Sequence, residues 1–149
     1  MLNDILIEIF ERDLAALKNE VSAYETEAEM WQVSGEIKNS GGNLALHLIG
    51  NLSHFIGAVL GDSGYIRNRD AEFSLKDIPR ENIIAAIDET GAVIRSTILK
   101  LTEQDLDKKY PIEVFGRPMS TEFFLVHLAT HLSYHLGQIN YHRRLLASG

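Results

Sequence analysis

Apolar side chains recur every three or four positions in four stretches of the chain, with polar and charged side chains between them. This spacing is typical of amphipathic helices, because an α-helix completes a turn in about 3.6 residues. The first stretch covers residues 2–24 and is expected to continue as helix to about residue 30. The other three cover residues 44–60, 79–101 and 121–146.

Three connections separate these predicted helices. Residues 38–43 hold paired glycines with Asn and Ser, which interrupt helices and supply caps. Residues 62–78 and 102–120 are long enough for at least one connection to cross the bundle, and the second could form a small hairpin. Four amphipathic helices without a strand pattern predict an all-α four-helix bundle, with residues 1–149 as a single domain. The periodicity alone leaves the order of helix directions open.

Two glycines interrupt the second predicted helix. Gly50 and Gly57 are seven residues apart and therefore lie on one stripe of that helix. Glycine weakens a helix by about 1 kcal/mol relative to alanine, so its presence calls for a packing reason. We expect both glycines to allow a close approach between helices.

Composition narrows the possible chemistry. The chain has no cysteine, which excludes disulfides and thiolate metal sites and leaves His, Asp, Glu or water as ligands for a transition metal. A net charge of −7 and the lack of a basic patch argue against a nucleic-acid partner. The acidic N-terminus does not resemble a secretion signal, and no apolar run is long enough to cross a bilayer. These features predict a cytoplasmic protein without a membrane partner.

Four of the six histidines lie in the last predicted helix, at His127, His131, His135 and His142. Steps of four, four and seven residues return to nearly the same face of a helix, so the imidazoles form one stripe. Such a stripe is normally Leu, Ile or Val. Two imidazoles four residues apart stand about 6 Å apart along the axis, close enough to share one metal ion.

A complete site needs a third ligand from another helix. The second predicted helix offers His47 or His54, while the last offers His127 with His131 or His131 with His135. Bundles build metal sites from side chains that face one another across helices. Three neutral imidazoles leave an open coordination position, which is the arrangement of catalytic sites. The spacing does not choose among these ligand sets.

The sequence resembles the DinB-like superfamily, and in particular a branch of unknown function. His47-Leu-Ile-Gly-Asn51 resembles the family's His-Leu-x-Gly-Asn segment, and Arg67-Asn-Arg-Asp-Ala-Glu-Phe73 resembles the branch's Arg-x-Arg-x-x-Glu-Phe segment. His131-Leu-Ser-Tyr-His-Leu-Gly-Gln138 is similar to the family's His-x-x-x-His-x-Gly-Gln motif. Many relatives carry Arg at the position of Leu136, a difference that does not affect the candidate ligands.

The resemblance implies an up-down-down-up bundle with a long crossover between the second and third helices. It also implies a divalent ion, Zn or Ni first and Mn or Fe as alternatives, held by His47, His131 and His135. Related proteins use such an ion with a low-molecular-weight thiol, and homodimers are common among them. By this assignment His54 and His127 become secondary metal candidates, and His142 has no assigned role.

Four further residues are candidates for cofactor binding or support of the site. Asn51 and Gln138 lie one turn from proposed ligands and could orient an imidazole, or could form ordinary interhelical hydrogen bonds. Arg67 and Arg69 could bind an anionic substrate or thiol carboxylate. Local ion pairs with Asp62, Asp70 or Glu72 are the simpler interpretation of both arginines.

These patterns favour a metal-dependent enzyme of the thiol transferase or hydrolase type. The bound cation would activate a thiol or water against a small-molecule electrophile. The alternatives are a metal-binding protein without turnover and a structural or interaction bundle. No catalytic side chain, nucleotide motif or phosphate loop is evident in the sequence.

Overall fold

The computed structural model describes residues 1–147. Four long helices form the body of the protein: α1 (Leu2–Ala23), α2 (Gly41–Leu52), α4 (Arg80–Leu99) and α6 (Thr121–Leu146). The π-helical turn η2 (Ser53–Ala58) continues α2, and the short elements are η1 (Ala28–Trp31), α3 (Arg69–Ser74) and α5 (Glu103–Asp107). Within residues 1–147 there is no strand, only an isolated bridge between Lys109 and Ser120.

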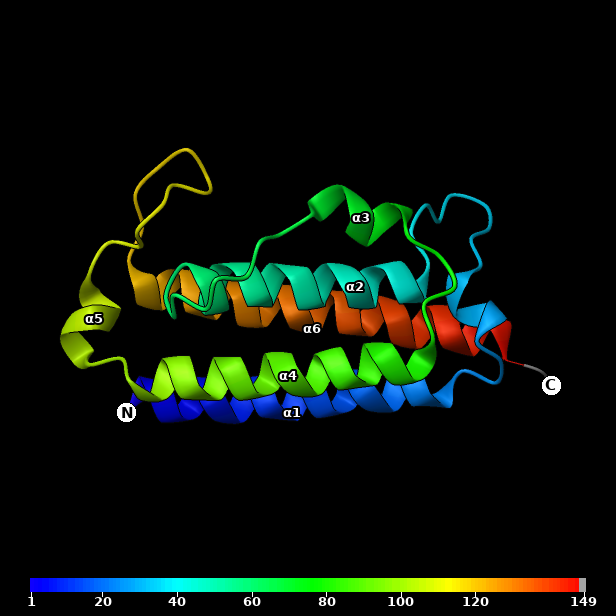
Figure 1. The fold of residues 1–149 in the computed structure, drawn as a ribbon, viewed down its shortest axis with the longest axis horizontal. Helices are drawn as coiled ribbons and strands as arrows, with labels where there is room; N and C mark the ends of the chain where they lie inside the picture. The colour runs from blue at the N-terminus through cyan, green and yellow to red at the C-terminus, as the bar shows by residue number, and fades with distance from the viewer. Residues whose placement is uncertain (148–149) are drawn as a thin grey trace.

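The helices follow the predicted up-down-down-up order. Figure 1 shows α1 and α6 running in one direction and α2 and α4 in the other. The crossover between α2 and α4 passes along the outside of α2 and contains α3. Helix α1 packs against α4 and α6, and α2 packs against α6, α3 and α4. The all-α bundle and its crossover are therefore confirmed.

The core is built from the apolar stripes of the four long helices. Burying a large apolar side chain stabilises the fold by about 1.5–3 kcal/mol, and each helix contributes several such side chains. Those buried almost completely include Phe10, Leu17, Leu48, Leu52, Ile56, Ile83, Ile87, Phe124, Leu125 and Leu132. No helix among the described residues is long and apolar enough to cross a membrane.

The first helix ends earlier than its apolar pattern suggests. The backbone leaves the helical conformation at Tyr24, and the expected continuation to about residue 30 is wrong. The Tyr24 side chain turns into the core, where its hydroxyl lies 2.6 Å from Nδ1 of His142. A Cβ on Gly41 would lie 1.9 Å from that hydroxyl, so the start of α2 needs a glycine there.

The second helix begins earlier and ends differently than expected. Its N-cap is Ser40, whose Oγ accepts a hydrogen bond from the Asn43 amide. The helix therefore includes Gly41 and Gly42, which were expected to lie in the connection before it. At its other end the backbone changes to a π-helical turn in which the Val59 amide donates to the His54 carbonyl. The regular α-helical periodicity therefore stops at Leu52.

Both long connections contain a short helix that the apolar pattern did not reveal. In the crossover, the Asn68 side chain accepts a hydrogen bond from the Ala71 amide and caps α3. In the later connection, a reciprocal pair of hydrogen bonds between Thr102 and Asp105 begins α5. The expected hairpin there is reduced to the single bridge at the base of a loop that projects from the bundle (Figure 1).

Candidate metal centre

Helices α2 and α6 bring three histidines together, and the fold explains why. The two helices are antiparallel neighbours, so His47 from α2 meets His131 and His135, which are one turn apart on α6. The ring centroid of His47 lies 5.1 Å from that of His131 and 5.2 Å from that of His135. One nitrogen of each ring lies within 4.8 Å of the others, the only such cluster of potential ligands within residues 1–147.

The same nitrogen of each ring points to the centre of the cluster. Nε2 of His131 lies 3.3 Å from Nε2 of His47 and 3.1 Å from Nε2 of His135. The opposite nitrogen of His47 lies 3.0 Å from Oε1 of Glu72, and that of His135 lies 2.7 Å from Oε1 of Gln138. Carboxylate and amide oxygens only accept, so Nδ1 of both histidines carries a proton, and in the neutral ring Nε2 then presents a lone pair.

This protonation pattern leaves a conflict that a cation would resolve. Nε2 of His131 faces two lone pairs and can carry at most one proton, so one of its two contacts lacks a hydrogen bond. The pKa of His131 is lowered to about 4, mainly by burial and to a smaller extent by the neighbouring rings of His135 and His47. Burial also lowers the pKa of His47. All three features favour neutral imidazoles around a positive ion.

Glu72 is the functional residue that sequence reasoning missed. Its carboxylate is buried and accepts hydrogen bonds from Nδ1 of His47 and from Nε and Nη2 of Arg67, the latter two at 2.9 and 3.0 Å. The predicted local ion pair between Arg67 and Glu72 is thus confirmed. The only signal in the sequence was the position of Glu72 in the Arg-x-Arg-x-x-Glu-Phe segment, because periodicity does not reveal a buried carboxylate in a connection.

Gly50 makes room for the Glu72 carboxylate. A Cβ at this position would lie 1.9 Å from Oε2 of Glu72. The expected close approach at Gly50 is therefore one between α2 and the short helix α3, through the Glu72 side chain. Gly57 allows the approach of α4, because a Cβ there would lie 3.1 Å from Val93.

Arg69 differs from Arg67 in its surroundings. Its guanidinium lies 5.3 Å from the ring of Phe73, and that ring lies 4.9 Å from the ring of His47. Arg67 is paired with Glu72, but among residues 1–147 no ion pair holds Arg69, so the local ion pair expected for Arg69 is not found. Arg69 is therefore the arginine that is available to an anion near the cluster.

Gln138 and Asn51, the two amide candidates, differ in their hydrogen bonding. Gln138 contacts His135, whereas Oδ1 of Asn51 is buried without a hydrogen-bond partner among the described residues. Nδ1 of His131 is also buried and unpaired. The structure thus supplies an orienting group for two of the three imidazoles, and a supporting role for Asn51 stays a prediction.

The remaining histidines lie outside the cluster. His54 belongs to the π-helical turn, packs on Phe55, and has its pKa lowered by burial and then by Arg67. His127 packs between Phe115 and Phe124, with its ring 6.3 Å from that of His131. The two secondary metal candidates are therefore neighbours of the cluster and not members of it.

His142 has a structural environment. Its Nδ1 lies against the Tyr24 hydroxyl, and its Nε2 lies 2.8 Å from the carbonyl of Gln32. The carbonyl can only accept, so Nε2 donates and Nδ1 accepts from the tyrosine. Both ring nitrogens are satisfied, and the residue ties α6 to the connection that follows η1.

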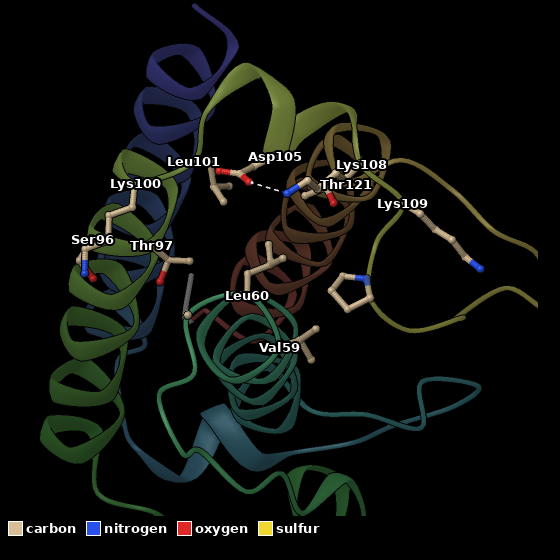
Figure 2. Close-up of a pocket in the computed structure, with 12 residues that line it drawn as sticks. Val59, Leu60, Ser96, Thr97, Lys100, Leu101, Asp105, Lys108, Lys109 and Thr121 are labelled. Atoms are coloured by element: carbon tan, nitrogen blue, oxygen red, sulfur yellow. Dashed lines mark hydrogen bonds and ion pairs between the residues drawn. The ribbon is translucent and has the colours of Figure 1, made fainter.

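A separate cavity of about 440 Å³ lies at the end of the bundle where α4 ends and α6 begins. Lys100, Lys108 and Lys109 are among its lining residues, which raises the question of an anion site. Figure 2 shows Lys108 joined to Asp105 and the Lys109 side chain pointing away from the other two. The three lysines do not converge on one point, so the cavity does not form an anion site as the histidine cluster forms a candidate metal site.

Comparison with known proteins supports the fold and leaves the reaction open. A family model described as "Protein of unknown function (DUF1572)" matches residues 5–149. A conserved protein from Enterococcus faecalis has a similar structure, with a TM-score of 0.81 and 15% identity over 98% of this chain and 97% of that one. A DinB-like protein from Bacillus cereus ATCC 10987 gives a TM-score of 0.72 and 16% identity over 94% and 89%. No curated protein matches the sequence.

Proposed function

The chain belongs to the DUF1572 family, and from the geometry of its own residues we propose that it is a metal-dependent enzyme. His47, His131 and His135 would hold one divalent cation through their Nε2 atoms. The observation that carries this proposal is the meeting of three Nε2 atoms, two of them fixed as lone-pair donors by Glu72 and Gln138. A carboxylate or amide behind a histidine ligand is a regular feature of protein metal sites.

The ligand set narrows the identity of the ion. Three neutral nitrogens suit Zn or Ni best, with Mn or Fe as alternatives, and the chain has no cysteine to favour a thiolate metal. Three protein ligands leave a coordination position for a small molecule. When bound, such an ion supplies a Lewis acid that lowers the pKa of a thiol or water.

The surrounding residues divide the remaining tasks. Glu72 and Gln138 hold His47 and His135 in orientation, and Arg67 fixes Glu72. Arg69 is the group that could pair with a carboxylate of a low-molecular-weight thiol or of the electrophile. No described side chain forms a nucleophile–base pair beside the cluster, which supports a bound thiol or water as the nucleophile.

Metal content is the direct test of this proposal. The purified protein is expected to hold about one Zn, Ni, Mn or Fe per chain by elemental analysis. Returning the physiological metal to chelated protein at about 100 times its Kd should add about 2.7 kcal/mol to the free energy of unfolding. At about 2–4 °C per kcal/mol, the melting temperature should rise by roughly 5–10 °C. Protein that contains none of these metals and does not respond to any of them contradicts the proposal.

A second experiment separates an enzyme from a metal-binding protein without turnover. Cobalt-substituted protein should change its visible absorption spectrum when a low-molecular-weight thiol is added, because an open coordination position accepts the sulfur. The thiol should also be consumed together with a generic electrophile. A saturated cobalt spectrum that ignores the thiol would favour the binding protein, whose ion has no free position.

A further inference from the structure

An apolar trough runs along α6 from the histidine cluster toward the end of the helix. Two hollows of about 540 and 610 Å³ form it, and they share Ile37, His142 and Leu145. We call this space the α6 trough: it begins at His135 and Gln138, and Leu44, Tyr141 and the shared residues are among those that line the rest. Figure 1 places the connection between η1 and α2 at the same end of the bundle as the last turns of α6.

Three apolar side chains of the lining are largely exposed, whereas Leu44 and His142 are buried. Ile37 is 44% exposed, Tyr141 67% and Leu145 73%. Single apolar side chains on a surface need no explanation, but a continuous group of them marks an interaction site. Tyr134, Gln138, Tyr141 and Leu145 follow steps of four, three and four, so they share one face of α6.

The trough is elongated and begins at a proposed metal ligand. From position 134 to position 145 the helix rises about 16 Å, at about 1.5 Å per residue. His135 contributes Nε2 to the cluster and Nδ1 to Gln138, and both residues also line the trough. A molecule in the trough therefore starts beside the cluster and extends away from it.

We propose that the α6 trough binds an uncharged, elongated apolar arm of the molecule that reacts at the metal centre. This inference rests on the proposed function and adds a substrate class to it. Glu36 and Lys38 both lie at the trough and carry opposite charges, so the lining has no net preference for an anion or a cation. The apolar surface beyond them suits an alkyl or similar chain.

Binding should therefore depend on chain length. For metal-free protein, straight-chain alcohols from 1-butanol to 1-octanol should bind about three- to fourfold more tightly for each methylene that becomes fully buried. NMR signals from the methyl groups of Ile37 and Leu145 should shift. For cobalt-loaded protein, n-alkanethiols should change the visible spectrum at lower concentrations as the chain lengthens.

Two matched variants locate the effect. Leu145→Asp should reduce the increase in affinity per added methylene at least twofold, whereas Leu99→Asp should leave this increase unchanged. Leu99 is 51% exposed at the end of α4, so it offers the same substitution near a helix C-terminus away from the trough. Both variants should keep the wild-type metal content, because neither residue touches the histidine cluster.

The outcomes separate the two proposals. Equal binding of all chain lengths, or an unchanged slope in Leu145→Asp, overturns the trough proposal even if the metal binds. A wild-type dimer in sedimentation experiments that Leu145→Asp dissociates also overturns it, because a second copy then covers the trough. If neither the wild type nor the variants bind metal, but alcohol affinity still rises with chain length, the proposed function fails. The trough then remains an apolar binding site without a metal centre beside it.

Discussion

Replacing His131 by alanine is expected to lower the metal content of the purified protein from about one ion per chain to background. His131 lies between the other two histidines, with its Nε2 atom 3.3 and 3.1 Å from theirs. Its loss leaves His47 and His135 without the central ligand, and two nitrogens do not provide the three protein ligands of a typical catalytic site. Elemental analysis of wild type and variant, purified in parallel, measures the effect.

His127→Ala is the matched control for this experiment. His127 also lies on α6, is also half-buried, and stands four residues before His131, so the HxxxH spacing occurs on both sides of His131. Its ring packs on Phe115 and Phe124 and lies outside the cluster, so its variant should retain the ion. Loss of metal from His127→Ala with retention in His135→Ala would show that the other pair holds the ion.

Stability of the metal-free variant provides a second readout. In the metal-free protein, His131 has a buried unpaired Nδ1 and an Nε2 that faces two lone pairs. Unmet hydrogen bonds of buried groups cost about 1–3 kcal/mol each, so removing this ring relieves part of the cost of folding and offsets the lost packing. We expect the metal-free variant to melt close to the metal-free wild type. The wild type alone should then gain stability when metal is added.

The sequence was sufficient for the existence of the four long helices and of a histidine stripe, but not for the short helices α3 and α5. Periodicity identified the four long helices because each buries one continuous apolar face, and Ser120 caps α6 as its residue type suggests. Periodicity could not separate His127 from His135, which are equally spaced from His131. That choice depends on which turn of α6 lies opposite His47, and only the packing of α2 on α6 determines it.

Local sequence patterns also could not reveal interactions between distant segments. At the end of α1, Tyr24 forms a hydrogen bond with His142, which lies 118 positions later in the chain. The contact between Glu72 and His47 requires the crossover to fold back onto α2. Both features are tertiary contacts that helix periodicity does not reveal, and the second of them orients a candidate metal ligand.

Gly50→Ala is expected to weaken metal binding about 10- to 100-fold, the usual effect of losing a group that orients a histidine ligand. The added methyl group would lie 1.9 Å from Oε2 of Glu72 and 2.6 Å from its Cδ, so the carboxylate must move. That movement strains its hydrogen bonds to His47 and to Arg67. Alanine also favours a helix over glycine by about 1 kcal/mol, so the loss of affinity should occur in a protein that still folds.

Gly137→Ala separates this effect from a general response to alanine. Gly137 lies on α6 between His135 and Gln138, and a Cβ there would meet no atom within 4 Å. This variant should gain up to about 1 kcal/mol of stability and keep the wild-type metal affinity. The pair of variants therefore makes the same substitution beside the same site, and only one of them displaces Glu72.

A spectroscopic measurement shows whether the loss of affinity arises through His47. In metal-free wild-type protein, nitrogen NMR of His47 should show the proton on Nδ1, because Glu72 only accepts a hydrogen bond. Gly50→Ala should shift the population toward the other tautomer, and Glu72→Gln should retain the Nδ1 proton through its amide oxygen. Unchanged metal affinity and an unchanged His47 tautomer in Gly50→Ala would show that the carboxylate does not control this ligand. The close approach at Gly50 would then serve only the packing of α3 on α2.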